Sequence, residues 1–150
     1  MISKNVEVRL LTKKDLNSFK ELIMLFYEVF EHENKAIPSD LYLERLLKRT
    51  DFVVYVVNLN SKLVGGLTAY VLDGYYTEQS EFFIYDIAIK PHYQGNGLGS
   101  KLLSTLKNQA ERSGIKEIFV AAHEEDVQAV NFYRSTGGEA EKVIHFNYRI

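Results

Sequence analysis

The chain has 150 residues, of which 46% are hydrophobic and 25% are charged, and this length and balance predict one globular domain with a sizeable core. Eighteen basic and twenty acidic residues give a net charge of −2, which argues against a nucleic-acid-binding protein because such proteins usually carry a basic surplus. The absence of cysteine excludes disulfides, thiolate metal sites and a cysteine nucleophile.

The first fifty residues predict a strand followed by two helices. Residues 6–12 alternate between apolar and polar side chains, as a strand does. In residues 13–31 the apolar side chains recur at spacings of three and four, which indicates an amphipathic helix. Residues 39–49 predict a second helix, with Ser39 placed to cap its N-terminus.

The middle of the chain predicts a hairpin, a central strand and a long helix. Residues 51–74 contain two β-rich runs around a turn at 58–62. Residues 80–90 are nearly continuous in apolar and aromatic side chains, as expected of a strand that is covered on both faces. A helix is expected from about Gly97 to Ser113, where Gly114 stops it.

The last third predicts a strand at residues 116–123, a helix at 126–137 and a closing strand at 142–150. Together the elements predict an α/β (α+β) chain in which a mixed sheet has helices on both faces. The N-terminus lacks the apolar core of a signal peptide, and no apolar run approaches the ~18 residues of a membrane span. We therefore expect a soluble, cytoplasmic protein that binds no membrane.

Three glycines, Gly95, Gly97 and Gly99, lie between the predicted central strand and the long helix. Glycine lets the backbone approach a ligand closely, and the helix start adds roughly half a positive charge. This arrangement predicts a phosphate-binding loop, and a flexible surface turn is the simpler alternative. A P-loop is excluded by its missing Gly-Lys-Ser/Thr order, and a dinucleotide fingerprint would need glycine at Ser100.

The spacing Gln94-x-x-Gly97-x-Gly99, after a strand and before an amphipathic helix, resembles the acetyl-CoA pyrophosphate loop of the GNAT N-acetyltransferase superfamily. A second motif in residues 126–138 resembles the N-x-x-A-x-x-(F/L)-Y-x-x-x-G helix of that family, with matches at Ala129, Tyr133 and Gly137. The predicted order of elements also matches the family fold along the whole chain. That fold implies a mixed, mostly antiparallel sheet of about six to seven strands within a single domain, residues 1–150.

From roughly Leu22 to the C-terminus the chain is similar to the aminoglycoside 3-N-acetyltransferase branch, most clearly in the strand SEFFIYDIAI. The resemblance implies an enzyme that transfers acetyl from acetyl-CoA to the 3-N amine of an aminoglycoside, inactivating a small-molecule antibiotic and releasing CoA. Two alternatives stay open: a GNAT enzyme for another amine, such as a protein N-terminus, a polyamine or an amino-acid derivative, and a non-catalytic acyl-CoA-binding module. A dimer is common among relatives of this type, so a homodimer is also open.

The resemblance places acetyl-CoA along the fourth strand and the glycine loop. The implied cofactor-binding residues are Ile87, Ala88, Ile89, Gln94, Gly95, Asn96, Gly97, Leu98, Gly99, Ser100 and Asp126. Asp126 stands where many members carry the asparagine that bonds the pantetheine arm. A carboxylate accepts hydrogen bonds as that asparagine does, but it cannot donate an amide N–H.

Two residues are candidates for the chemistry. Tyr133 matches the family tyrosine beside the sulfur, and a phenol with a pKa near ~10 is acidic enough to protonate a leaving thiolate. The alternative is that Tyr133 only packs the helix. Asp86 is the lone ionisable residue in an apolar strand, so it is either a base that faces a polar site or a structural aspartate bonded to backbone. His123 competes as the base.

Acidic and aromatic residues suit a polycationic sugar substrate. The candidate substrate-binding residues are Glu28, Glu31, Tyr85, Asp86, His123 and Glu124. Glu33, Glu81, Glu125 and the tyrosines at 70, 75 and 76 are further candidates, although acids at a helix start also favour helix capping. No residue is assigned as a metal ligand.

Overall fold

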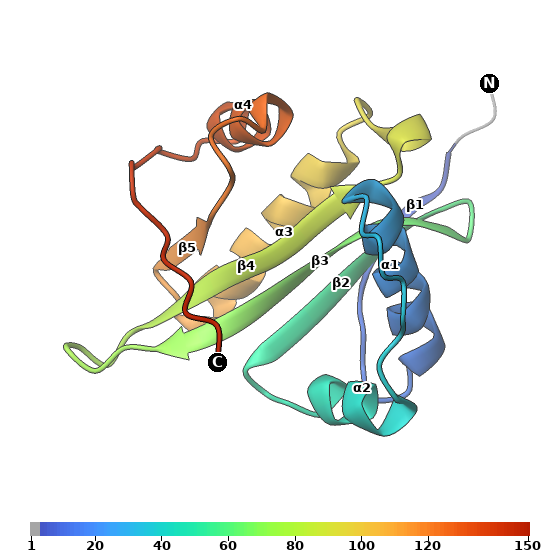
Figure 1. Cartoon of the computed structure of the whole chain (residues 1–150), viewed down its shortest axis with the longest axis horizontal. Helices are drawn as coiled ribbons and strands as arrows, with labels where there is room; N and C mark the ends of the chain where they lie inside the picture. The colour runs from blue at the N-terminus through green and yellow to red at the C-terminus, as the bar shows by residue number, and fades with distance from the viewer. Residues whose placement is uncertain (1–3) are drawn as a thin grey trace. The chain divides into compact units, whose positions relative to one another are not determined.

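A mixed β-sheet organises the first part of the chain (Figure 1). The computed structural model describes residues 4–150, which divide into one unit ending at Val120 and a second unit, Ala121–Ile150. The strands are β1 (Val6–Leu10), β2 (Phe52–Leu59), β3 (Lys62–Asp73), β4 (Ser80–Ile89) and β5 (Glu117–Val120). They lie in the order of their numbering, antiparallel from β1 to β4 and parallel between β4 and β5. The predicted mixed, mostly antiparallel sheet is confirmed.

Helices cover both faces of this sheet. α1 (Leu16–Val29) and α2 (Asp40–Leu47) share one core cluster with β2 and β4, whereas α3 (Leu98–Ser113) lies on the opposite face (Figure 1). The side chains that α3 buries are Leu98, Leu102, Leu103, Leu106 and Ala110. A short 3-10 helix, η1 (Pro91–Tyr93), precedes α3, and α4 (Val127–Ser135) belongs to the second unit. The sheet therefore separates α3 on one face from α1 and α2 on the other.

The ends of two helices form as the sequence predicts. The Ser39 hydroxyl accepts a hydrogen bond from the backbone N–H of Tyr42 at 3.3 Å and so caps α2. Gly114 ends α3 in the left-handed conformation, with φ at 72°. Both signals are local, which is why residue type alone predicts them.

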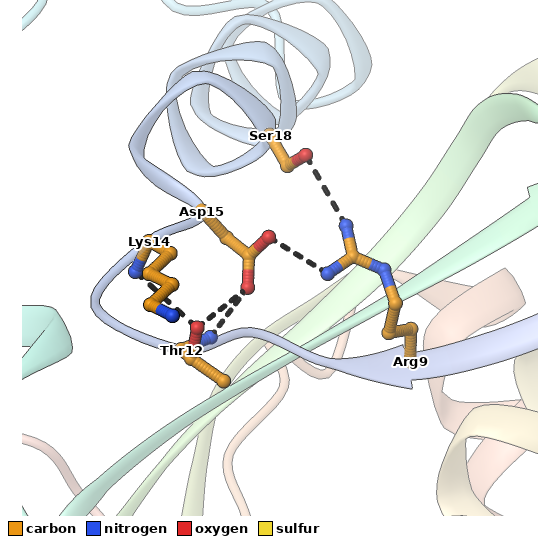
Figure 2. A network of polar contacts seen from close by, with 5 residues as sticks. All are labelled: Arg9, Thr12, Lys14, Asp15 and Ser18. Carbon is orange, nitrogen blue, oxygen red and sulfur yellow. Dashed lines mark hydrogen bonds and ion pairs between the residues drawn. The ribbon is translucent and has the colours of Figure 1, made fainter.

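The start of α1 is fixed to β1 by a polar network (Figure 2). The Arg9 guanidinium donates to the Asp15 carboxylate at 2.8 Å, and the Thr12 backbone N–H donates to the same carboxylate at 2.7 Å. These partners, Thr12 first and Arg9 second, lower the pKa of Asp15. A second nitrogen of Arg9 reaches the Ser18 hydroxyl at 3.4 Å, one turn into the helix. The network sets where α1 begins relative to the sheet.

Further along, α1 rests directly on β3 because Gly66 has no side chain. A Cβ built at Gly66 would lie 2.5 Å from Leu22 Cδ1 and 2.7 Å from the Tyr55 carbonyl oxygen. Leu22 is fully buried in the resulting contact. The glycine therefore fixes the height of α1 above the sheet.

Two predictions about the strands are wrong. The sheet of the described residues has five strands rather than six to seven, and β5 ends at Val120 rather than at His123. Residues 142–150, predicted as a closing strand, are irregular. The alternation of this segment is that of a strand, but alternation alone does not make a strand, because the backbone must also pair with that of a neighbouring strand.

None of the helices in the described part of the chain is long and apolar enough to cross a membrane.

Candidate functional site

The loop between β4 and α3 holds two glycines in the left-handed conformation. Gly95 and Gly97 have φ angles of 77° and 78°, which other residues adopt only with strain. The Gln94 side chain donates to the Ile89 carbonyl oxygen at 2.8 Å, and the Asn96 amide donates to the Tyr93 carbonyl oxygen at 3.1 Å. The polar side chains of the loop thus brace its backbone.

The space beside Gly95 and Gly97, where the loop enters α3, is open. A Cβ built at Gly95 or Gly97 would have no atom within 4 Å, and no side chain caps α3 at Gly97. The first intrahelical bond comes from the Lys101 N–H, so the preceding N–H groups of the first turn point out of the helix. With the positive end of the helix dipole, they form a cradle that fits a pyrophosphate. Binding of a phosphate by this loop remains a prediction.

One edge of β4 becomes free beside this loop. β5 pairs with β4 only from Glu81 to Ile84. Beyond that point Ile87–Ile89 pair with β3 on one side, and no strand of the described residues pairs with their other side. An extended ligand chain could hydrogen-bond to this free backbone, as the resemblance implies for the pantetheine arm.

A β-bulge interrupts β4 between the strand start and the free edge. Thr68 of β3 pairs with Asp86. Its neighbour Ala69 pairs with Ile84, so Tyr85 is an extra residue with no partner in β3. Bulges re-aim side chains and are over-represented next to active sites.

This bulge turns Asp86 toward α1. Residues paired across a ladder share a face, and Thr68 shares its face with Tyr70, which packs in the core cluster of α1 and α2. Asp86 therefore lies on the α1 face. If Tyr85 were not an extra residue, the alternation of side chains along β4 would place Asp86 on the same face as Ile84, beneath α3.

The Asp86 carboxyl is partly buried and weakly partnered. Burial raises its pKa from 3.8 to about 6, against a smaller lowering by His32. Its backbone N–H donates to the Thr68 hydroxyl at 3.2 Å, but no donor among residues 4–150 bonds to the carboxylate itself. The structural alternative, an aspartate bonded to neighbouring backbone, is therefore not observed. A carboxyl with this pKa is ionised at pH 7 and accepts protons readily.

His32 is a residue of this site that the sequence analysis missed. It follows α1 and lies near enough to Asp86 to influence its pKa. Its ring lies 5.3 Å from that of Tyr27, whose hydroxyl donates to the Ala36 carbonyl oxygen at 2.7 Å. These two contacts hold the segment after α1 against Tyr27. The sequence offered one signal: His32 lies among Glu28, Glu31 and Glu33, which were predicted to bind the substrate.

The two predicted acids of this stretch, Glu28 and Glu31, are exposed at the end of α1, where Glu31 has a left-handed φ of 55°. They belong to the same end of the helix as His32. Glu81 lies instead at the start of β4, the opposite end of the strand from the glycine loop. The structure therefore places Glu28 and Glu31 at the helix end that is followed by His32, and Glu81 at the other end of β4.

Aromatic rings surround the bulge. Tyr85 is 64% exposed, and its ring lies 5.9 Å from that of Tyr70 and 6.1 Å from that of Phe83. Tyr75 and Tyr76 are almost fully exposed in the turn before β4, away from Asp86. Of the predicted tyrosines, Tyr85 and Tyr70 are thus beside the candidate base.

The second unit carries the remaining predicted residues. Asp126 caps α4, because its carboxylate accepts from the Ala129 N–H at 3.0 Å. Tyr133 lies in the same helix, where its ring is 5.3 Å from that of Phe132. His123 and Glu124 are exposed before the helix. The capping alternative holds for Asp126, and the catalytic and binding roles of these four residues remain predictions.

No three acidic or histidine side chains within residues 4–150 are grouped so that they could hold a metal ion.

Comparison with known proteins identifies related chains. A model of the acetyltransferase (GNAT) family matches residues 16–137. An uncharacterised N-acetyltransferase of Methanocaldococcus jannaschii is 27% identical over 146 residues, which cover 94% of this chain and 64% of that protein. The chain thus spans less than two thirds of the length of this curated relative.

Solved structures give a more complete match. An aminoglycoside acetyltransferase, meta-AAC0020 from an uncultured soil metagenomic sample, was crystallised with trehalose and with sisomicin; it is 40% identical, with a TM-score of 0.94 over 97% of this chain and 96% of its own. The aminoglycoside N-acetyltransferase AAC(6')-Iy, solved in complex with CoA, has a TM-score of 0.82 over 99% of this chain and 97% of its own. At 16% identity, the second likeness concerns the fold alone.

Proposed function

Because this chain belongs to the acetyltransferase (GNAT) family and is an N-acetyltransferase, we propose that it acetylates a primary amine of an aminoglycoside with acetyl-CoA as donor. The observation that carries the proposal is the 40% identity, over nearly the whole of both chains, to an enzyme crystallised with sisomicin. The narrower hypothesis is acetylation at the 3-N position, with residues 1–150 acting as one domain. It rests on the likeness of the β4 strand to that branch.

The glycine loop and the free edge of β4 would hold the donor. When bound, acetyl-CoA supplies an acetyl group as a thioester. The N–H groups at the start of α3 would bind its pyrophosphate, because Gly95 and Gly97 leave the space beside them open. The backbone of Ile87–Ile89 would pair with the pantetheine arm, as an added strand does. Asp126 keeps its cap and offers that arm only acceptor atoms.

Asp86 and Tyr133 would move the two protons of the transfer. An aminoglycoside amine is cationic at neutral pH and must lose a proton before its nitrogen attacks the thioester carbonyl. The Asp86 carboxylate pairs with that cation and accepts the proton. As the carbon–sulfur bond breaks, the Tyr133 hydroxyl donates a proton to the departing thiolate. The attacking nitrogen, cationic once the carbon–nitrogen bond has formed, loses its second proton to solvent, and the Tyr133 phenolate regains one from solvent. His123 remains the alternative base.

The acceptor amine would bind on the α1 face of the sheet. Asp86 and the acids Glu28 and Glu31 favour a substrate with several positive charges. Tyr85 presents an exposed ring beside Asp86, suited to the apolar face of a sugar.

A thiol-release assay with acetyl-CoA and a panel of amines tests the proposal. The panel contains sisomicin, gentamicin, spermine and an alanine-starting peptide. We expect the highest kcat/KM with an aminoglycoside, and NMR of the product identifies the acetylated nitrogen. A product acetylated elsewhere than at 3-N contradicts only the narrower hypothesis. Preference for spermine or the peptide contradicts the aminoglycoside proposal, and no thiol release with any amine favours an acyl-CoA-binding module.

Gly97→Val is expected to weaken acetyl-CoA binding by at least about tenfold, measured by calorimetry. Valine adds a branched side chain in the open space of the loop, at a φ of 78° that it adopts only with strain.

Gly114→Val is the matched control for this variant. Gly114 has a φ of 72° and an equally open Cβ direction, but it lies at the far end of the same helix. The control should show a similar loss of thermal stability and normal binding. Equal affinities of a folded Gly97→Val variant and the wild type would place the donor elsewhere.

A further inference from the structure

Thr68 of β3 is a buried polar residue in apolar surroundings. In the described part of the chain it is the only buried residue that is neither apolar nor aromatic, and it is 6% exposed. Val54 pairs with it from β2, and Leu22 of α1 packs on Gly66, which shares its face of β3. Valine has nearly the same shape as threonine and would suit these neighbours. A hydroxyl in this place therefore needs a polar partner.

The partner of this hydroxyl is the backbone of β4. The Thr68 hydroxyl oxygen accepts a hydrogen bond from the backbone N–H of Asp86 at 3.2 Å. The oxygen belongs to a side chain on the α1 face, so this bond draws the start of Asp86 toward that face. It joins the side chain of Thr68 to the candidate base through the backbone and not through the carboxylate.

The bond is made where two residues of β4 compete for one place on β3. The flanking pairs consist of apolar residues on both strands: Ala69 with Ile84, and Leu67 with Ile87. Between these pairs β3 contributes only Thr68, whereas β4 contributes both Tyr85 and Asp86. The flanking pairs fix the register on either side of the bulge. They do not decide which of the two residues is the extra one.

The Thr68 hydroxyl decides between the two arrangements. In the observed one its oxygen takes the Asp86 N–H, Asp86 pairs with Thr68, and Tyr85 is the extra residue. In the other arrangement Tyr85 would pair with residue 68 and Asp86 would be the extra residue. A bulge re-aims the residues that form it, so the Asp86 carboxyl would leave its half-buried place. Valine at position 68 has no acceptor and would remove the preference.

We infer that Thr68 is the positioning residue of Asp86: its hydroxyl selects the bulge in which Asp86, rather than Tyr85, pairs with β3, and so holds the Asp86 carboxyl on the α1 face. The selection depends on the register of two strands and on one hydrogen bond. Its consequence for the reaction rate rests on the proposed function, in which Asp86 is the base. Thr68 contacts no reacting atom and acts through Asp86.

NMR titration of the Asp86 carboxyl carbon tests the selection without any substrate. The signal is assigned by its absence from Asp86→Asn. Burial raises the pKa of this carboxyl to about 6, and His32, which lowers that pKa, is present in every variant. Thr68→Val should move the midpoint by at least about half a pH unit, because a displaced carboxyl is buried to a different extent. Thr68→Ser keeps the hydroxyl and should keep the midpoint.

Ser39→Ala is the matched control for the titration. It also removes a hydroxyl that accepts from a backbone N–H, but at the start of α2. It should lower the melting temperature and leave the Asp86 midpoint unchanged. An unchanged midpoint in a folded Thr68→Val variant would overturn the inference.

A double-mutant cycle tests whether Thr68 acts through Asp86. We expect Thr68→Val to lower kcat/KM for sisomicin at pH 7 by at least about tenfold, with the loss in kcat and the calorimetric affinity for acetyl-CoA kept within about twofold. In the Asp86→Asn background the same substitution should cost less than about threefold, because no base is left to misplace. Thr68→Ser should restore most of the rate. Equal losses in both backgrounds would overturn the positioning role.

The two experiments separate this inference from the proposed function. A moved midpoint with an unchanged rate supports the selection of the bulge by Thr68 and contradicts Asp86 as the base. If sisomicin is not acetylated, the aminoglycoside proposal is contradicted, and the titration still decides the role of Thr68.

Discussion

Asp86→Asn is expected to lower kcat/KM for an aminoglycoside by at least about 10²-fold at pH 7, the usual contribution of a positioned base. Asparagine keeps the size of the side chain but removes the charge and the proton acceptor. Raising the pH should restore part of the rate, because more of the amine is then already neutral. Steady-state kinetics over pH 5 to 9 measure both effects. Asp73→Asn, at the far end of β3, is the control for the change in net charge.

The pKa of Asp86 also sets the pH profile of the wild type. With a pKa raised to about 6, the carboxyl is protonated at pH 5 and ionised at pH 7, so kcat/KM should rise across this interval. Asp86→Asn should lose the part of this rise that has its midpoint near pH 6 and keep only the increase that comes from deprotonation of the amine. A near-normal rate of the variant at pH 7 would assign the base role to His123 or to water.

As the pH rises, the free energy of unfolding should change in the opposite direction to kcat/KM. Because burial raises the pKa of Asp86 above its unfolded value, the folded state holds the proton more tightly, and stability falls as the pH rises from 3.8 through about 6. Asp86→Asn removes this penalty. Its melting temperature should therefore equal or exceed that of the wild type at pH 7 to 8, which a structural aspartate would not allow.

Tyr133→Phe is expected to lower kcat on the order of 10²-fold with little change in the affinity for acetyl-CoA. Phenylalanine retains the ring, and with it the contact to Phe132, but it cannot donate the proton that the leaving thiolate requires. Tyr76→Phe removes a hydroxyl from an exposed ring and serves as the control. Both kinetic constants and the calorimetric affinity are measured.

A loss confined to KM would make Tyr133 a binding residue rather than a proton donor. An unchanged kcat and KM would leave it a packing residue of α4. In both cases the Asp86 prediction stands, since it concerns a different proton.

Local signals allowed much of the first unit to be predicted from sequence. Gly97 and Gly114 bracket α3 because each adopts a left-handed φ that other residues avoid. Ser39 marks the start of α2 for a similarly local reason, a hydroxyl that accepts from the first turn.

The features that sequence analysis missed depend on partners distant in the chain. The bulge at Tyr85 has no local signal, because it follows from the register of Thr68 and Ala69 on the neighbouring strand. His32 comes near Asp86 only through the packing of α1 on the sheet. In residues 142–150 the alternation was recognised, but alternation does not identify the strand that will pair with it.

The anchoring of α1 has a consequence for how such an enzyme acquires new substrates. The helix is fixed at its start by Arg9 and Asp15 (Figure 2). It is fixed in its middle by the contact of Leu22 with Gly66. The segment after Val29 lies beyond both anchors, and it carries His32, which is near enough to Asp86 to influence its pKa. Under the proposed function, substitutions there would change which amine is accepted, while the proposed donor loop between β4 and α3 would keep its geometry. Substrate choice and donor binding can therefore evolve separately in this fold.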